Sequence, residues 1–343
     1  MNGEVLPRLL ERRPLGPQEV RGTFDEMVSR STPDTVRAAL LVALAARRHP
    51  TAEVVAFARE MRRRAVPFRV ASSDGAVDLC GSGGAAHPSF NVSTVSAFVV
   101  RAAGVSVVKH GNRSRTVCGS SDLLDALGLP VFASIPFARA SYRRYGLAFL
   151  HAPLFHPETR SVAAVRRQLS IPTIFNRLGP LSNPARVRYQ VTGAVDLETA
   201  ARTASMLRSL GVSEGLAMTS DEGCDEFSPR RPTTAVRWGR TRTQRFRVHP
   251  ETYLDPEDRR GSWGPLPPAA AAEETERILA GGGGARRGSV LLTSGAALWI
   301  SGRAPDLAAG IEKARDALDQ GLAEELLRDL GALAGNYSQK ERP

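Results

Sequence analysis

The spacing of apolar positions along the chain changes near residue 70. Before that point apolar residues recur at helical spacing, most clearly in the alanine- and leucine-rich run 36–47, which follows the helix start signal Ser31-Thr-Pro-Asp34. A second helix is expected from Thr51 to about Ala65. We therefore predict that the first 66 residues are helical.

From residue 76 onward, short apolar and β-branched runs alternate with helical stretches. These runs lie at residues 76–80, 104–109, 190–195, 215–218 and 288–292. Strands that alternate with helices are typical of an α/β fold, in which the crossovers make neighbouring strands parallel. We therefore predict an α/β fold class with a mostly parallel sheet behind the helical N-terminal part.

The C-terminal third mixes extended and helical patterns. Residues 230–268 are rich in Arg, Thr and Pro and have extended character, whereas 269–280 is predicted to be a helix. Gly281-Gly-Gly-Gly284 could mimic a phosphate-binding loop, but a connector from that helix to a last strand is the preferred interpretation. Two helices, 306–320 and 322–333, are expected at the end.

Length and composition favour a protein with a large core and no membrane segment. The chain has 343 residues, 42% of them hydrophobic, which leaves room for one or two domains. No apolar run approaches the ~20 residues that span a bilayer, and residues 1–7 lack a secretory pattern. Because Cys80, Cys118 and Cys224 cannot form a disulfide framework, we expect a reducing cytoplasm.

The net charge of +11 raises the question of nucleic-acid binding. The arginines are scattered, and the cluster Arg62-Arg-Arg64 lacks the interleaved aromatic residues on which bases stack. A small phosphorylated or carboxylated substrate would favour the same positive field. Charge alone leaves both classes of ligand open.

A glycine loop follows the first predicted strand. Gly81-Ser-Gly-Gly84 comes directly after residues 76–80, and Asn91-Val-Ser-Thr94 opens a long helix. Glycines after a strand let backbone N–H groups approach an anion, and the dipole of the following helix adds to the attraction. The spacing differs from the dinucleotide-binding fingerprint, so the loop predicts a phosphate site without naming its ligand.

The next strand delivers Lys109-His-Gly-Asn-Arg113. Of the 46 basic residues only Lys109, Lys313 and Lys340 are lysines, and Lys109 alone lies in the interior of the chain. A compact ammonium suits a phosphate or leaving-group oxygen, although an ordinary loop lysine has the same pattern. Because Gly119-Ser-Ser-Asp122 then starts another helix, two strand–loop–helix units present polar loops at one crevice.

Adjacent carboxylates follow a later strand. Asp225 and Glu226 come after residues 215–218, in a loop with Gly223 before them and Ser228-Pro229 after them. A few carboxylates together with substrate phosphate oxygens are the ligands that Mg²⁺ takes. Taken alone, the pair would more often be a solvated acidic turn, so the Mg²⁺ interpretation depends on the other loops.

Together these motifs resemble the anthranilate phosphoribosyltransferase family of the tryptophan pathway, over nearly the whole chain. The matching segments are Asp78-Leu-Cys-Gly-Ser-Gly-Gly84, Phe90-Asn-Val-Ser-Thr94, Lys109-His-Gly-Asn-Arg113, residues 119–128, His156-Pro157, Val165-Arg-Arg167, residues 173–184 and Asp225-Glu-Phe-Ser-Pro229. Their order and spacing make the resemblance specific.

The resemblance implies a Mg²⁺-dependent pentosyltransferase that moves 5-phosphoribosyl from phosphoribosyl pyrophosphate (PRPP) to an aromatic acid, anthranilate by default. It implies that the donor is lined by Gly81, Gly84, Asn91, Ser93, Thr94, Lys109 and Arg113, with Ser120 nearby. It places one Mg²⁺ against Ser93 and the other on Asp225 and Glu226. The aromatic acid would be framed by Gly81, His110, Asn112 and Arg166. No protein nucleophile is required: Lys109 and Arg113 would act by neutralising leaving-group charge.

The same resemblance implies an architecture. Residues 1–70, joined by the helices near 157–185, would form a small helical domain. Residues 71–156 and 186–343 would form the PRPP-binding α/β domain, with the site in the cleft between the two. The family is usually a homodimer that associates through the helical domain, so we expect a homodimer.

Two departures from the family pattern fall on the donor side. Ala85 stands where the family has an aspartate, and residues 114–118 form a loop one residue shorter that lacks a serine pair. Arg115 could replace those serines with a charge-assisted hydrogen bond, or donor binding could be weakened.

Other interpretations therefore stay open. The chain could use another aromatic acid in secondary metabolism, or it could be a non-catalytic, nucleic-acid-binding paralogue. A pyrimidine nucleoside phosphorylase is disfavoured because its lysine–serine phosphate loop is missing. The three cysteines could hold zinc with His87 and His110, although their spacing favours packing.

Overall fold

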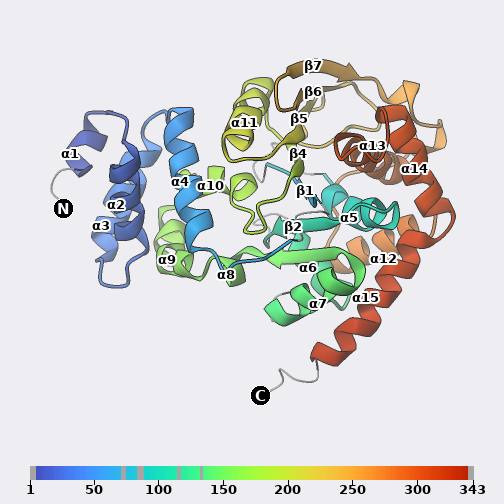
Figure 1. Cartoon of the computed structure of the whole chain (residues 1–343), viewed down its shortest axis with the longest axis horizontal. Helices are drawn as coiled ribbons and strands as arrows, with labels where there is room; N and C mark the ends of the chain where they lie inside the picture. The colour runs from blue at the N-terminus through green and yellow to red at the C-terminus, as the bar shows by residue number, and fades with distance from the viewer. Residues whose placement is uncertain (1–4, 71–74, 83–88, 114–116, 132–133, 339–343) are drawn as a thin grey trace.

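A computed structural model of the chain describes residues 5–70, 75–82, 89–113, 117–131 and 134–338 (Figure 1). Helices form a separate layer at the N-terminal end, at the left of Figure 1. They are α1 (Val5–Leu10), α2 (Pro17–Val28), α3 (Asp34–Ala45) and α4 (Thr51–Arg64). Two helices from much later in the chain, α9 (Arg160–Leu169) and α10 (Ile174–Leu178), share the same buried core.

A seven-stranded sheet forms the rest of the framework, in the order β3-β2-β1-β4-β5-β6-β7. Its strands are β1 (Val77–Cys80), β2 (Val107–Gly111), β3 (Leu147–His151), β4 (Tyr189–Gly193), β5 (Glu214–Ser220), β6 (Thr233–Trp238) and β7 (Thr243–Val248). The pairs among β1 to β5 are parallel, and β6 and β7 are added antiparallel at one edge. The predicted α/β fold with a helical N-terminal part and a mostly parallel sheet is confirmed.

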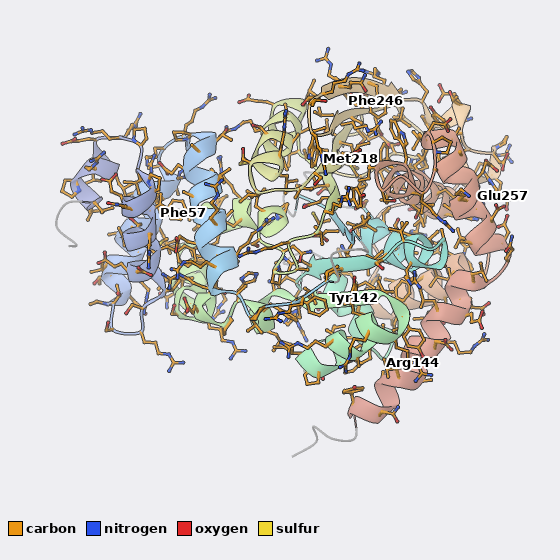
Figure 2. The ribbon with its side chains drawn as sticks, viewed as in Figure 1. Phe57, Tyr142, Arg144, Met218, Phe246 and Glu257 are labelled. Atoms are coloured by element: carbon orange, nitrogen blue, oxygen red, sulfur yellow. The ribbon has the colours of Figure 1, made fainter. Side chains whose placement is uncertain are left out.

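Alternate residues of β5 face two different cores. Leu216 and Met218 of β5 pack with the C-terminal helices, whereas Ala217, between them, packs with the N-terminal helices. Phe57 of α4 belongs to the core of the N-terminal helices, and Met218 belongs to the core of the C-terminal helices. Both residues are labelled in Figure 2. The helices that share a core with Leu216 and Met218 include α5 (Val92–Ala102), α6 (Ser120–Ala126), α12 (Pro268–Leu279), α13 (Ala285–Ile300), α14 (Leu307–Asp319) and α15 (Leu322–Ser338).

The remaining helices connect the layers. They are α7 (Ile135–Tyr145), α8 (Ala152–Phe155) and α11 (Leu197–Ser209), with short 3₁₀ turns at Pro157–Thr159, Gly179–Leu181, Pro250–Thr252 and Glu257–Arg259. Helix α11 packs against α4, so the apolar core of the N-terminal helices continues onto the sheet through α11. None of the helices in the described parts of the chain has the length and apolar character needed to cross a bilayer.

The strand predicted at 288–292 is wrong, because those residues belong to helix α13. This helix is buried on almost every side, so it has no polar face, and its apolar residues show no helical periodicity. Gly288 and Gly295 allow close packing. A Cβ added at Gly288 would lie 2.1 Å from the Asp258 carbonyl oxygen, and one added at Gly295 would lie 2.4 Å from Ile311 Cγ1. The Gly281–Gly284 run consequently joins two helices, α12 and α13, and not a helix and a strand.

Most other predicted elements are confirmed within a few residues. Strand β3 was not predicted, although Leu147–His151 is a short apolar run after Gly146, which ends α7 in the left-handed conformation with φ 66°. The extended character of 230–268 corresponds in part to β6 and β7.

Candidate active site

The predicted site loops gather where β1, β2 and β5 end. Because these strands are parallel, their carboxyl ends meet at one edge of the sheet. The loop after β5 returns across the end of β4, where a Cβ on Gly193 would lie 1.8 Å from the Asp225 carbonyl oxygen. Glycine at this position lets the backbone of Asp225 approach the sheet.

Asp225 is bound to the loop that follows β1. Its Oδ2 accepts hydrogen bonds from the Ser82 N–H at 2.5 Å and from Ser82 Oγ at 2.7 Å. A Cβ on Gly81 would lie 2.9 Å from the same oxygen. The glycine loop and the acidic loop, 143 residues apart in sequence, are therefore in direct contact.

Glu226 is the least satisfied carboxylate of the site. Burial, followed by the neighbouring Asp225 carboxylate, raises the pKa of Glu226 to about 8, while Lys109 and the Ser93 N–H act in the opposite direction. Within the described residues its Oε2 is buried without a hydrogen-bond partner. A buried carboxylate with a free oxygen beside a second carboxylate fits a hard cation.

Lys109 lies beneath these loops with 3% of its surface exposed. Its Nζ donates to the Leu79 carbonyl oxygen at 2.5 Å and to Ser93 Oγ at 3.1 Å. Burial lowers the pKa of Lys109, whereas Asp78, Cys80 and Glu226 raise it. The ammonium therefore holds Ser93 in place and lies among the carboxylates of the site.

The N-terminus of α5 supplies the other donor-side residues. The Asn91 carbonyl oxygen accepts the N–H groups of Thr94 and Val95 at 3.0 and 3.1 Å. The Asn91 side chain donates to the Cys118 carbonyl oxygen at 3.1 Å, which ties α5 to the segment before α6. Thr94 is 1% exposed, so its side chain packs inside the protein.

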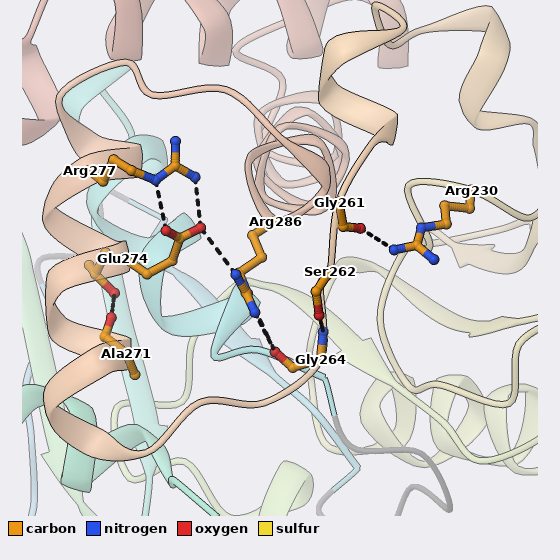
Figure 3. A network of polar contacts seen from close by, with 9 residues as sticks. Arg230, Gly261, Ser262, Gly264, Ala271, Glu274, Arg277 and Arg286 are labelled. Atoms are coloured by element: carbon orange, nitrogen blue, oxygen red, sulfur yellow. Dashed lines mark hydrogen bonds and ion pairs between the residues drawn. The ribbon is translucent and has the colours of Figure 1, made fainter.

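A polar network outside the site, shown in Figure 3, joins α12, α13 and Gly264 through Arg286. Arg286 donates to the Gly264 carbonyl oxygen at 3.3 Å and to Glu274 at 3.5 Å, and its guanidinium lies 5.6 Å from the centre of the Phe90 ring. The Phe90 N–H donates to the Trp263 carbonyl oxygen at 3.0 Å. Helices α12 and α13 thereby fix the residues immediately before Asn91.

The loop after β2 is more open. Ser120 Oγ donates to the Asn112 carbonyl oxygen at 3.2 Å, and a Cβ on Gly111 would lie 2.2 Å from that hydroxyl. The Arg113 side chain is 60% exposed, with Nε 3.7 Å from Asp122 Oδ1. Asn112, Arg113 and Ser120 are thus brought together at the start of α6.

His110 faces the elements of the helical part. Its ring packs edge-on against His156, with centroids 5.1 Å apart. Burial, followed by the repulsion that a protonated His156 would exert, lowers the pKa of His110 well below its usual value, and burial lowers the pKa of His156 to about 4. Among the described contacts, Nε2 of each of these rings is buried without a partner. A pair of uncharged rings with free nitrogens therefore lines this side.

Arg166 lies on a different element, helix α9. Its guanidinium donates to Asn176 Oδ1 at 3.3 Å and lies 5.2 Å from the centre of the Phe175 ring. Asn176 in turn accepts the Thr173 N–H at 2.9 Å. Residues 173–176 thus orient Arg166, a support that the sequence analysis did not foresee.

Several predicted features lie outside the described residues: Gly84, Ala85, His87 and Arg115. The cysteines can be assessed. Burial raises the pKa of Cys80 to about 12 and those of Cys118 and Cys224 to about 11. No group of three or more His, Cys, Asp or Glu residues in the described parts of the chain is arranged to hold a metal. Mg²⁺ does not need such a group, because it can use two carboxylates and substrate oxygens.

Two buried polar residues beside the site, Asp78 and Asn183, were not among the predicted site residues. Asp78 lies in the buried strand Val77–Cys80 and is 1% exposed; Asn183 has no exposed surface. A charged residue inside a four-residue apolar strand was the available signal.

Comparison with known proteins places this arrangement in a family. Residues 73–324 match the a/b domain of a glycosyl transferase family, and residues 3–65 match the helical bundle domain of a glycosyl transferase family. The chain is 36% identical to the anthranilate phosphoribosyltransferase of Desulfosudis oleivorans, over 96% of this chain and 98% of that protein.

Solved structures agree. The crystal structure of the anthranilate phosphoribosyltransferase from Thermus thermophilus matches with a TM-score of 0.87 and 32% identity, over 97% of this chain and 99% of that one. The Saccharomyces cerevisiae enzyme in complex with PRPP and Mg shares the fold, with a TM-score of 0.84 and 23% identity over 98% of each chain. The chain belongs to the anthranilate phosphoribosyltransferase family.

Proposed function

We propose that this protein transfers 5-phosphoribosyl from PRPP to the amino nitrogen of anthranilate and releases pyrophosphate. The observation that carries the proposal is the contact of the glycine loop with the Asp225–Glu226 loop, in a chain 36% identical to a named anthranilate phosphoribosyltransferase over nearly its full length. The departing group is a polyanion, and this part of the site has the groups to receive one.

Mg²⁺ is the cofactor that these residues fit. Asp225, Glu226 and the Ser93 hydroxyl are the residues that would hold it, and the free Oε2 of Glu226 supports this assignment. When bound, the ion neutralises negative charge on the pyrophosphate. The structure of the yeast relative with PRPP and Mg supports the same choice.

The donor side works by position and charge. The N-terminus of α5, formed by Asn91, Ser93 and Thr94, directs a favourable helix dipole toward phosphate oxygens, while the Thr94 and Ser93 N–H groups are already bonded to Asn91 and Glu226. Lys109 holds Ser93 and adds positive charge beneath the loop. We propose that Gly81, Gly84 and Ser120 complete the donor side, and that Arg113 also serves it as its exposed guanidinium moves from Asp122 to the pyrophosphate.

The acceptor side lies between β2 and the helical part. The Arg166 guanidinium has the fork geometry that binds a carboxylate through two oxygens. His110 is neutral at physiological pH because its pKa is far below its usual value, so it can contact an uncharged amine without adding charge. Gly81 and Asn112 would complete this side of the site.

We also propose the assembly and division expected from the family. The protein would be a cytoplasmic homodimer formed through the helical domain. The helical domain would comprise residues 1–70 and the helices near 157–185. The α/β domain would comprise residues 71–156 and 186–343. Sedimentation equilibrium tests the dimer directly. The alternative of a nucleic-acid-binding paralogue gains no support from relatives that are named as transferases.

The test is turnover. Purified protein is mixed with PRPP, Mg²⁺ and anthranilate, and loss of anthranilate fluorescence is followed. Turnover that disappears in the Asp225→Ala/Glu226→Ala variant is the expected result. Donor binding by calorimetry without turnover would instead indicate a different aromatic acceptor. Absence of donor binding would refute the transferase assignment.

A further inference from the structure

Strands β1 and β2 separate as they approach the site. Their ladder has one register pair, Val77 with Val107, whereas β1 and β4 pair at four positions from Val77 to Cys80. Backbone groups of β1 and β2 beyond that pair need other partners, because they are buried. Side chains supply those partners here.

Asp78 and Asn183 fill the gap between the strands. Asp78 Oδ1 accepts the His110 N–H at 3.2 Å, and Asp78 Oδ2 accepts a hydrogen bond from Asn183 Nδ2 at 2.9 Å. The same Asn183 nitrogen donates to the Val108 carbonyl oxygen at 2.8 Å, and Asn183 Oδ1 accepts the Ala185 N–H at 2.9 Å. The two side chains form a continuous hydrogen-bonded bridge from β1 to β2.

This bridge joins the three segments on which the proposed chemistry depends. Asp78 lies three residues before Gly81, and His110 begins the acceptor side. Asn183 lies near the end of the segment 173–184, whose first residues, 173–176, orient Arg166. Gln190 and Arg62 donate to the carbonyl oxygens of Pro180 and Leu181 at 2.8 and 2.6 Å, so this last segment is itself fixed.

We propose that Asp78 and Asn183 are positioning residues that hold β1 and β2 apart at their carboxyl ends and so set the distance between the donor and acceptor sides. The proposal rests on the proposed function for its kinetic consequence. Its structural consequence, the protection of β2 by the Asp78–Asn183 bridge, does not depend on the reaction.

Three variants test the bridge. Asp78→Asn keeps the shape and the acceptor for His110 but sets two amide groups against each other. Asn183→Asp sets a carboxylate against Asp78 and against the Val108 carbonyl oxygen. The exchange Asp78→Asn/Asn183→Asp restores one amide–carboxylate pair. Asp258→Asn is the matched control, because Asp258 is also buried, at 2% exposed, but bonds Arg287 of α13 at 2.6 Å and not a residue of β1 or β2.

The expected kinetic result separates positioning from binding. Each single variant should lower kcat about 10- to 100-fold, as loss of supporting contacts does. The PRPP–Mg²⁺ dissociation constant, measured without acceptor, should stay within about threefold. The exchange variant should recover part of the kcat lost in Asn183→Asp. Asp258→Asn should lower the melting temperature and leave kcat unchanged. A folded Asp78→Asn variant with wild-type kcat, or one that loses only donor affinity, would overturn the proposal.

Hydrogen–deuterium exchange decides the structural part. Peptides that cover Val107–Gly111 should exchange faster in Asp78→Asn and Asn183→Asp than in wild type or Asp258→Asn. Unchanged exchange would overturn the proposal even if the wild-type enzyme proved inactive toward anthranilate. Wild-type inactivity combined with faster exchange in the variants would refute the proposed function alone.

Discussion

Two buried glutamates show how differently this chain treats the same side chain. Glu53 lies in the helical part and is 2% exposed; Glu226 lies at the sheet edge and is 4% exposed. Glu53 Oε1 accepts hydrogen bonds from Arg47 at 2.6 Å and His49 at 2.8 Å, and Oε2 accepts the Leu15 N–H at 2.9 Å. Glu226 has a second carboxylate beside it and a buried oxygen without a partner among the described residues.

The pKa values follow the contacts. Burial tends to raise the pKa of Glu53, but the hydrogen bonds from His49 and Arg47 outweigh it and the pKa is lowered. Burial and Asp225 raise the pKa of Glu226 to about 8. A buried carboxylate whose oxygens both accept hydrogen bonds stabilises the fold. A buried carboxylate with an oxygen that accepts none indicates a binding site for a positively charged ligand.

Substitutions of Glu226 and Glu53 should differ most in their effect on catalysis. Glu226→Gln keeps the shape but removes the charge that would hold Mg²⁺, and we expect kcat/KM to fall on the order of 10³-fold, as when a key electrostatic contact is lost. The anthranilate fluorescence assay at saturating Mg²⁺ measures it. Glu53→Gln is the matched control and should keep the wild-type rate per folded molecule. A Glu226→Gln enzyme within tenfold of wild type would remove Glu226 from the metal site.

The fold was predictable where the apolar pattern has a clear period or a clear stop. The helices near 36–47 and 51–65 and the strands near 76–80 and 104–109 have both. Helix α13 has neither, because burial on nearly all sides erases its polar face and leaves a run that is indistinguishable from a buried strand over 288–292. Its 16-residue length was the signal that favoured a helix.

The site was predictable as a set of loops but not as a set of contacts. The motifs identify Lys109 and Asp225, yet not that the Lys109 ammonium bonds Leu79 and Ser93. Such contacts depend on how far β1 and β2 separate, which no local pattern encodes. Asp78 and Asn183 were missed for the same reason. Asp78 bonds His110, 32 residues away in sequence, and Asn183, 105 residues away.

The second largest effect is on stability. Glu53→Gln leaves Arg47 buried without its counter-charge, and removal of one partner from a buried ion pair costs about 3 kcal/mol. Urea unfolding should show a lower midpoint with an unchanged slope. Glu251→Gln, which alters an exposed carboxylate, should change the free energy of unfolding by less than about 0.5 kcal/mol. A similarly small loss in Glu53→Gln would show that the Glu53 cluster is not a structural anchor.

A smaller effect has the opposite sign. In metal-free protein above pH 8, Glu226 is ionised in a buried place beside Asp225, and Glu226→Gln removes that cost. We expect an increase in the apparent melting temperature of about 2 °C. Added Mg²⁺ should stabilise wild type but not the variant, because a ligand stabilises only the state that binds it. Mg²⁺ stabilisation that survives in Glu226→Gln would contradict the assignment of Glu226 as a ligand.

The smallest effect is the pH dependence of the stability changes caused by Glu53→Gln and Glu226→Gln. The two dependences should have opposite slopes. The folded-state pKa of Glu53 is below its usual 4.5, so its contribution to stability is present above pH 4.5 and is lost as the pH falls through the folded pKa. The folded-state pKa of Glu226 is raised from 4.5 to about 8, so its contribution is complete below pH 4.5 and is lost as the pH rises through about 8. Melting curves of metal-free wild type and both variants across this range measure the two slopes. The stability lost in Glu53→Gln should therefore shrink toward acid, while the stability gained in Glu226→Gln should grow toward alkali. Parallel slopes would mean that both carboxylates have equivalent surroundings, and the contrast between an anchored and a ligand-ready glutamate would not hold.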